Sequence, residues 1–448
     1  MKSDKNIKRY LNELLDSLEQ LDFSYEELGL QTSFSKSMHS VRCLIEDKLQ
    51  VIENIEDRNR SVFSSEVYDE SWKKSKREVE NAIRNLVNHA NNLKEHGEFK
   101  NALLSLFDAH ELANLINNHK LTFEINFLEG SLYNFLGERE LALSYLNNCQ
   151  NYYLNTRDPE KLTYLNLEKA LLAFNLGDYL LVSEKLESVI FYASQSENLK
   201  MLFRSKLIQG RISAILESST QAIHFFEEIL KITNSNENPE IRAESYYNIG
   251  KHLLEQGELN SANRFLDLGT KLCEDHQLLF PLGFIGLEKS RLYLQLQRYT
   301  DAFKFVILSL EIFIQSEDFV AVAHACLVLA ENITAIYENE QSIPFYQLSI
   351  EIFQDYDFPF EIAMAYTKYA YALMAMEMGA EAVKHYQVAL NIFEKLNLPE
   401  FYEKINNQLL EYEIGEPVRE IVVDPSQGVM DEQPKNEYHN KIDKSIEK

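Results

Sequence analysis

The sequence has little of what marks an exported, disulfide-bonded or membrane-spanning protein. It has no apolar stretch behind its charged first residues, as a secretory signal would have. It has no run of about 18 uninterrupted apolar residues; the nearest stretch, 319–336, is broken by His324, Glu331 and Asn332. The cysteines are few and scattered, without paired spacing: Cys43, Cys149, Cys273 and Cys326. We therefore expect a cytoplasmic protein with reduced cysteines and no membrane-spanning helix.

Basic residues are also scarce. The chain has 44 Lys and Arg against 70 Asp and Glu, a net charge of −26. A chain this acidic repels the phosphate backbone, so nonspecific nucleic-acid binding is not expected. Residues 25–36 faintly resemble a helix-turn-helix, but the helix that follows carries acidic as well as basic side chains, where a DNA-reading helix needs cationic donors. We favour a helical capping bundle over a DNA-reading domain for this region.

Motifs for catalysis and metal binding are missing as well. The sequence has no His-Glu-x-x-His, Cys-x-x-Cys or Gly-x-Ser-x-Gly motif. Ser245 stands where a phosphate-binding loop before Lys251 would need its first glycine. Acidic pairs such as Glu227 and Glu228 are expected by chance in a chain with so many carboxylates. We therefore expect no enzyme activity, no cofactor and no metal.

What the chain has is a period of 40 residues, most visible in the segment 250–266. Steps of 40 through Gly250 find small residues: Ala90, Gly130, Ala170, Gly210, Gly250, Ser290, Ala330 and Ala370. Steps through Ala262 find another mostly small series: Ala102, Ala142, Val182, Ala222, Ala262, Ala302, Ser342 and Ala382. Steps through Leu266 find large residues: Leu106, Leu146, Leu186, Phe226, Leu266, Val306, Tyr346 and Tyr386. Three registers that agree without an insertion predict stacked two-helix units.

The pattern resembles the tetratricopeptide repeat, whose motif has a small residue in helix A, a Gly-x-aromatic turn, and an Ala and an aromatic in helix B. The turns at Gly97, Gly177 and Gly257 carry this likeness. Four other turns lack the glycine and have Glu217, Gln297, Tyr337 and Glu377 instead. The period is longer than the usual 34 residues. It looks like the long-helix variety found in bacterial peptide-sensing regulators and some eukaryotic adaptors.

The resemblance implies an all-α, right-handed superhelical solenoid of eight units. We expect an N-terminal helical cap at 1–82, repeats at 83–402, a capping helix at 403–414 and a disordered tail at 415–448. The tail holds three of the nine prolines. The expected units are 83–122, 123–162, 163–202, 203–242, 243–282, 283–322, 323–362 and 363–402.

Cations recur on the stripe of helix A that lines the concave groove in this family. Arg211, Lys251 and Arg291 follow one another at 40-residue steps, joined by Arg204 and by Asn248 one turn before Lys251. One interpretation is a site for an anionic group, such as a peptide carboxylate, an acidic side chain or a phosphate, with Asn248 bonding the peptide backbone. The other is that the cations pair with neighbouring acidic side chains, which are Glu244, Glu255, Glu288 and Glu331.

Farther along, the same stripe is less charged. His324, Met364 and Tyr371 could receive an apolar side chain of a partner, or be covered by the C-terminal tail. The sequence therefore predicts a non-enzymatic scaffold that binds a peptide or protein segment in its groove. The alternative is a peptide-controlled signalling regulator whose N-terminal helices act on a response regulator or on DNA.

Overall fold

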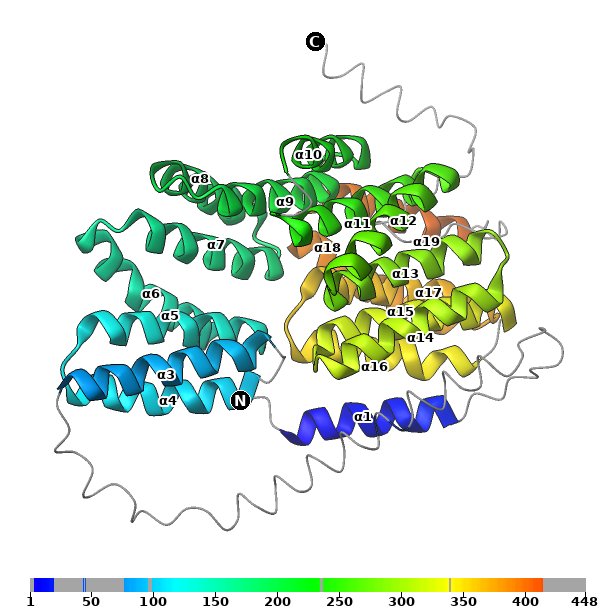
Figure 1. Cartoon of the computed structure of the whole chain (residues 1–448). Helices are drawn as coiled ribbons and strands as arrows, with labels where there is room; N and C mark the ends of the chain where they lie inside the picture. The colour runs from blue at the N-terminus through cyan, green and yellow to red at the C-terminus, as the bar shows by residue number, and fades with distance from the viewer. Residues whose placement is uncertain are drawn as a thin grey trace.

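The computed structural model of the chain describes residues 4–19, 43, 45, 76–95, 99–233, 237–337 and 340–413, and these residues form helices and short turns without a strand (Figure 1). The expected tail at 415–448 and most of the expected N-terminal cap lie outside the described residues. The prediction of an all-helical solenoid is confirmed.

Each unit pairs two antiparallel helices, an inner one and an outer one. The inner helices are α3 (Lys76–Glu95), α5 (His119–Phe135), α7 (Pro159–Asn175), α9 (Leu199–Leu216), α11 (Pro239–Glu255), α13 (Leu279–Gln295), α15 (Phe319–Tyr337) and α17 (Pro359–Ala375). The outer helices are α4 (Phe99–Leu115), α6 (Arg139–Thr156), α8 (Tyr179–Gln195), α10 (Ser219–Ile232), α12 (Leu259–His276), α14 (Tyr299–Gln315), α16 (Ile343–Asp355) and α18 (Gly379–Lys395). A short 3-10 turn, η2 (Glu340–Ser342), precedes α16, and α19 (Pro399–Glu413) follows the last unit. The inner helices from α5 onward begin four residues before the unit boundaries expected from the sequence.

The 40-residue period is made of two 20-residue steps, each a helix and a turn. Twelve of the described turns contain a residue with a positive φ: Asn117, Gly137, Arg157, Gly177, Glu197, Gly257, Gln277, Gln297, Glu317, Asp357, Glu377 and Asn397. At Gly257 the backbone N–H donates to Leu254 O at 3.0 Å, and the N–H of Glu258 donates to Leu253 O at 2.8 Å. This Schellman arrangement satisfies carbonyls left open at the helix end. Gln297 and Glu377, where the family glycine is missing, still take the left-handed conformation.

The small and large residues of the repeat meet inside each unit, as the sequence predicts. A Cβ atom on Gly250 would lie 2.6 Å from Cδ2 of Leu266, and a Cβ on Gly210 would lie 2.7 Å from the Phe226 ring. Ala262 and Leu266 are fully buried. The glycine therefore allows the two helices to approach until the large side chain fills the space between them.

The array curves with the first helix of each unit on its inner side. Successive inner helices, such as α11 and α13 or α13 and α15, contact one another directly. No outer helix of the described chain packs to a comparable extent on the outer helix of the next unit. Because neighbours are closer on one side than on the other, the stack bends toward the inner helices (Figure 1).

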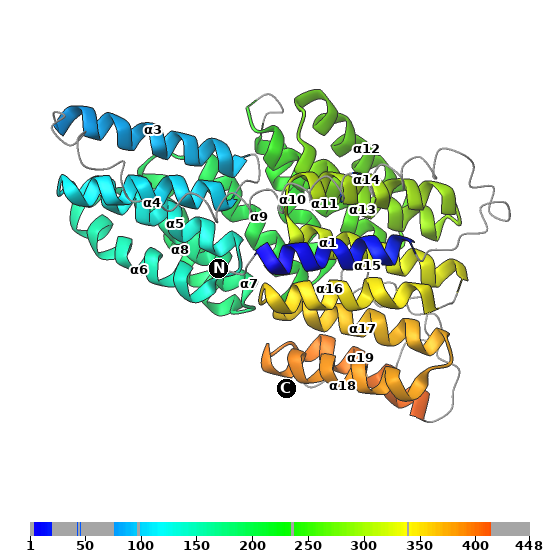
Figure 2. The ribbon, with the colours of Figure 1, turned by 90° about the horizontal axis from the view of Figure 1, so that it is seen from below.

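The curve brings distant units together, so that the array closes on itself (Figure 2). The turn after α5, at Gly137–Arg139, contacts the turn after α16, at Tyr356–Phe358. The turn after α7, at Gly177, contacts Leu396 in the turn after α18. We call these two turn-to-turn contacts the seam. It joins the second and third units to the seventh and eighth.

Helix α1 (Asp4–Glu19) packs on α16 of the seventh unit, rather than as a cap over the first unit (Figure 2). Its buried side chains are Tyr10, Leu11, Leu14 and Leu18, spaced at helical intervals along one face. At its edge Arg9 Nη2 lies 2.6 Å from Glu351 Oε1, and the Tyr10 hydroxyl donates to the Asp355 carboxylate. This contact joins residues about 345 positions apart, so the helical pattern of residues 1–22 could not predict it.

One helix in the described part of the chain, α15, has a stretch long and apolar enough to cross a membrane by length and composition alone. This stretch, Phe319–Ile336, is 72% buried inside the array. It packs against α13, α14, α16 and α17. These neighbours account for its apolar character, because a helix surrounded by other helices buries side chains on all sides.

Candidate functional site

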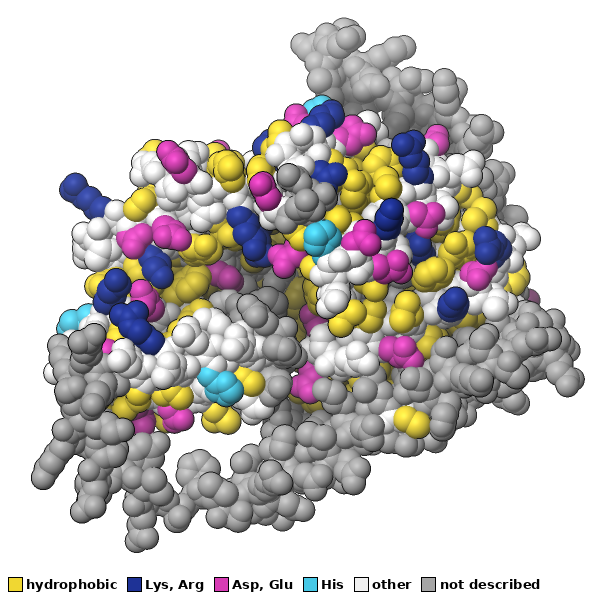
Figure 3. Space-filling view, in the orientation of Figure 1, with side chains coloured by type: hydrophobic (Ala, Val, Ile, Leu, Met, Phe, Trp, Pro, Cys, Tyr) yellow, Lys and Arg dark blue, Asp and Glu magenta, His cyan; other side chains and the backbone are white. Residues whose placement is uncertain are grey.

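The inner helices place one stripe of side chains along the concave side of the array. We define the inner stripe by two rows at 40-residue steps. The first row is Arg204, Glu244, Phe284, His324 and Met364. The second row is Arg211, Lys251, Arg291, Glu331 and Tyr371. Positions seven residues apart on a helix share a face, so both rows lie on the same side of each inner helix. Charged residues of both signs are interspersed on the molecular surface in Figure 3 rather than gathered into a patch of one sign.

At the start of the inner stripe the cations form half-exposed ion pairs between α9 and α11. Arg204 Nη2 lies 3.7 Å from Glu240 Oε2, and Arg211 Nη2 lies 3.4 Å from Glu244 Oε2. The side chains of these four residues are 38–48% exposed. Pairs this open to water contribute roughly 0–1 kcal/mol to stability, so a ligand can replace either partner at little cost.

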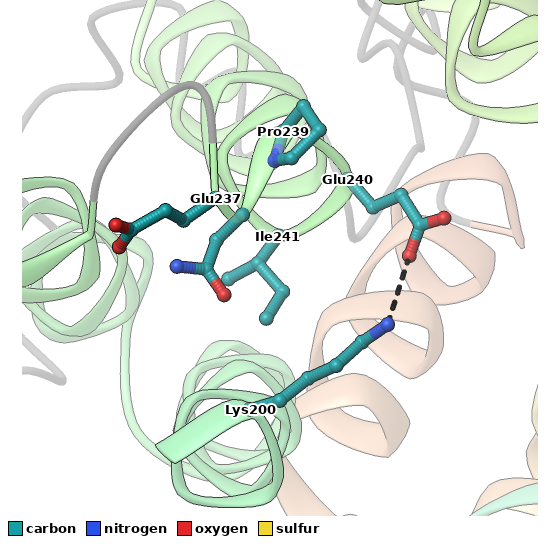
Figure 4. A pocket seen from close by; sticks show the side chains of 6 residues that line it. Lys200, Glu237, Pro239, Glu240 and Ile241 are labelled. Atoms are coloured by element: carbon teal, nitrogen blue, oxygen red, sulfur yellow. Dashed lines mark ion pairs between the residues drawn. The ribbon is translucent and has the colours of Figure 1, made fainter.

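A small hollow lies beside these pairs, where α9 and α11 begin (Figure 4). Lys200 spans it toward Glu240, with 3.8 Å between Nζ and Oε2. The hollow measures about 100 Å³, which suits a few water molecules rather than a cofactor.

Arg291, in the same row as Arg211, is built into a buried network. Its Nη1 donates to Glu288 at 2.8 Å and its Nε donates to Glu331 at 3.2 Å. Lys368 of α17 donates to the other oxygen of Glu331. Arg291 is only 8% exposed. The network ties α13, α15 and α17 together, which supports the structural-pairing interpretation for Arg291.

The expected pairing partner Glu255 serves a different contact. Its carboxylate lies 2.6 Å from Nδ1 of His252 and accepts a hydrogen bond of 2.6 Å from the Ser219 hydroxyl. Ser219 belongs to the fourth unit, whereas His252 and Glu255 belong to the fifth. Glu255 therefore links these two units.

The charge of Lys251 affects the pKa of a carboxyl group that belongs to a distant unit. Burial raises the pKa of Glu361, at the start of α17, to about 7, and the charges of Lys251 and Arg139 lower it from a still higher value. Lys251 belongs to the fifth unit, Glu361 to the eighth and Arg139 to the second. The inner side of the curve therefore brings three distant units within electrostatic reach of one another.

Asn248 and Met364 are packed more tightly than a groove residue would be. Asn248 is 4% exposed and donates to Glu244 O, one turn earlier on its own helix, at 2.7 Å. Met364 is 7% exposed. Tyr371 is half-buried and lies near Tyr346 and Tyr386, whose pKa values are raised mainly by burial and further by Tyr371. The binding roles that the sequence suggests for these three residues stay predictions.

The middle of the inner stripe is aromatic. Phe284 lies at ring-centroid distances of 5.8 Å from Tyr247, 5.2 Å from Phe280 and 6.1 Å from His324. Phe280 is 46% exposed. The sequence interpretation found His324 but missed the two phenylalanines, although Phe284 occupies the same repeat position as Arg204. The shift from charged to aromatic residues along that row was the signal that could have found them.

Metal ligands and reactive thiols are two features that could support chemistry beyond binding. Among those residues, no three His, Cys, Asp or Glu side chains gather as metal ligands would. Burial raises the pKa of the Cys149, Cys273 and Cys326 thiols to about 12, which keeps them protonated and unreactive.

Comparisons with known proteins show the architecture. No family model and no curated protein matches the chain. Among solved structures, the chain is similar to a Rap protein complexed with competence and sporulation factor, at a TM-score of 0.50 and 12% identity, covering 76% of this chain and 99% of that one. A weaker match, BtubC (BKLC) from P. vanneervenii, has a TM-score of 0.32 and 16% identity over 54% of this chain and 92% of that one. The chain is an all-helical repeat array, and its repeat resembles the tetratricopeptide repeat.

Proposed function

We propose that this protein is a non-enzymatic, cytoplasmic scaffold that binds a peptide or protein segment along its inner stripe. The observation that carries the proposal is the change of chemistry along that stripe. Half-exposed cations stand on α9, paired with carboxylates of α11, and a partly exposed aromatic group follows on α13. A surface with a charged part beside an apolar part suits a segment that carries an acidic group next to an apolar side chain.

The charged part would hold the acidic group. Arg204 and Arg211 already bind carboxylates of α11 at the surface, so they can exchange these for a carboxylate of the ligand. Phe280 and Phe284 would hold the apolar side chain, because a half-exposed aromatic ring gains by losing contact with water. Arg291 would act indirectly, by fixing the spacing of α13, α15 and α17.

A panning experiment with displayed random peptides tests the proposal without a known ligand. We expect the selected peptides to share an acidic residue beside an apolar one. Lys251→Glu should then weaken their binding by about tenfold and reduce its dependence on salt, because one attractive charge becomes repulsive in a partly shielded groove. The matched control is Lys271→Glu, the same charge change on the exposed side of α12.

Two results would count against this site. One is a set of selected peptides without shared acidic character. The other is a Lys251→Glu variant that melts at a lower temperature but binds like the parent, since that outcome makes Lys251 a structural residue. Stability and affinity are therefore measured on the same preparations.

A second candidate function is that of a peptide-controlled signalling regulator. Two observations favour it: the likeness in fold to the Rap protein solved with competence and sporulation factor, and the docking of α1 on the repeat array. Under this proposal a ligand on the inner stripe changes how α1 sits on α16, and the N-terminal region acts on another protein. Capture of partners from the native host, identified by mass spectrometry, separates the two functions: a response regulator supports the regulator, and a larger assembly supports the scaffold.

A further inference from the structure

The seam repeats with the period of the array. The contact Gly177–Leu396 lies one repeat after the contact Gly137–Tyr356. Residue 177 follows residue 137 by 40 positions, and residue 396 follows residue 356 by 40 positions. In both contacts, a turn that follows an inner helix meets a turn that follows an outer helix. The seam is therefore a regular feature of how the curve closes, and not a single chance contact.

Glycines lie where the seam is tightest. A Cβ atom on Gly137 would lie 3.0 Å from Cα of Tyr356, and one on Gly177 would lie 2.5 Å from Cδ2 of Leu396. A Cβ on Gly257, the third glycine of this turn type, would meet nothing within 4 Å. Turns elsewhere in the array take the same backbone conformation with Gln, Glu or Asn. At Gly137 and Gly177 the absence of a side chain thus serves the approach of another turn as well as the local backbone.

Arg139 supplies the polar contact across the seam. Its Nη1 donates to Asn134 O at 2.7 Å, within its own unit, while its Nη2 donates to Tyr356 O at 3.1 Å, 217 residues away. Its guanidinium also lies 4.7 Å from the centre of the Phe358 ring. Arg139 is 8% exposed, and burial lowers its pKa to about 10, so it keeps its charge at neutral pH. The seventh unit thus provides both a carbonyl and a ring for one buried cation.

The seam is slight compared with the joints between neighbouring units. Units next to each other bury whole helix faces, whereas the seam joins the tips of turns. A small contact between two parts of one chain permits relative motion, whereas a large apolar interface prevents it. A curved stack of repeats is flexible along its length, because each unit contacts only its neighbours.

We propose that the seam is a clasp through which the array opens. The second and third units part there from the seventh and eighth, each unit keeps its internal packing, and the inner stripe between α9 and α17 becomes accessible from the side. Arg139 and Phe358 hold the clasp shut. This inference does not depend on which ligand the inner stripe binds, so it is tested on the protein alone.

The test measures the distance across the seam by pulsed electron resonance between spin labels. The labels are placed on the full-length chain at two exposed positions beside the seam, as Glu140→Cys and Gln354→Cys. Cys43→Ser removes the one described cysteine that is not buried. The parent should give mainly a short, narrow distance distribution. Arg139→Ala should raise the ratio of long to short distances about tenfold, the effect of losing a buried charged hydrogen bond.

Phe358→Leu removes the ring that contacts Arg139 across the seam, and it should also raise the ratio of long to short distances. Because both changes remove one shared contact, the double variant should open little more than either single variant. The matched control is Arg242→Ala. Arg242 likewise donates to two backbone carbonyls, those of Leu230 and Thr233 at 2.8 Å each, and lies 5.6 Å from the Tyr246 ring, but between the fourth and fifth units.

Arg242→Ala should lower the melting temperature and leave the distance across the seam unchanged. Circular dichroism shows whether each variant keeps its helices. An unchanged short distance in both Arg139→Ala and Phe358→Leu, in folded protein, overturns the clasp. So does an equal lengthening in Arg242→Ala, because that result means general loosening of the array.

Discussion

Arg211 and Arg291 occupy the same repeat position, two units apart, and have opposite surroundings. Arg211 is 38% exposed and holds one carboxylate, Glu244, at 3.4 Å. Arg291 has a side chain 10% exposed and bonds two carboxylates, one of them shared with Lys368. A periodic sequence thus fixes where a side chain points, while its neighbours in the next units decide whether it is available to a ligand or committed to the fold.

The largest effect is expected at the carboxylate that Arg291 and Lys368 share. Glu331→Ala leaves two cations buried without their common partner, which should destabilise the array by about 3–5 kcal/mol. Glu244→Ala, the matched change beside Arg211, should cost less than about 1 kcal/mol. Urea unfolding of both variants measures the difference. Equal losses would mean that burial does not distinguish the two arginines.

Ala262→Phe tests the packing of the fifth unit, which lies between the units of Arg211 and Arg291. Overpacking against Gly250 and Leu266 should destabilise by about 1–3 kcal/mol. Because units interact with their neighbours only, the melting curve should become broader or split into phases. A variant that melts like the parent would show that this helix contact is loose.

The pH dependence of stability should report on Glu361. Burial raises its pKa to about 7 in the folded protein, above its value of 4.5 in an unfolded chain. The folded state therefore binds the extra proton between these values, and its stability should fall as the pH rises through that window, by roughly 3 kcal/mol. Glu361→Gln should remove this part of the decline. A parallel decline in the variant would assign it to other groups.

The smallest effect is expected in the turns. Gln297 has a φ of 57°, a conformation that glycine adopts without strain. Gln297→Gly should stabilise the array by about 0.5–1 kcal/mol, because the relief at this helix end exceeds the entropy lost by glycine. The same substitution at Glu217, whose φ is −124°, should give no gain. Thermal melting of the two variants compares them directly.

The periodic part of this architecture could be read from the sequence. Gly250, Ala262 and Leu266 predicted which helices touch, because a tight helix pair needs a small residue facing a large one. The turns proved more regular than their residues suggested. Gln297 and Glu377 take the conformation of the missing glycine because the helices on either side impose it.

The contacts between distant units could not be predicted in this way. Nothing in the pattern around Arg139 indicates that it meets Tyr356, since the curvature that joins them is the sum of small rotations between many units. For the same reason the sequence could not predict that α1 packs on α16. The cations of the inner stripe were found, but their availability depends on side chains contributed by the next units.

The seam also fixes how many units lie between its two partners. Gly137 faces Tyr356 and Gly177 faces Leu396, so closure is possible only when a fixed length of chain lies between the partners. Deleting one whole 40-residue unit from the middle would leave the remaining helix pairs intact and would place the turn at Leu396, in place of the turn at Tyr356, opposite Gly137. The seam therefore sets how many units one full turn of the array holds, whatever the total number of units.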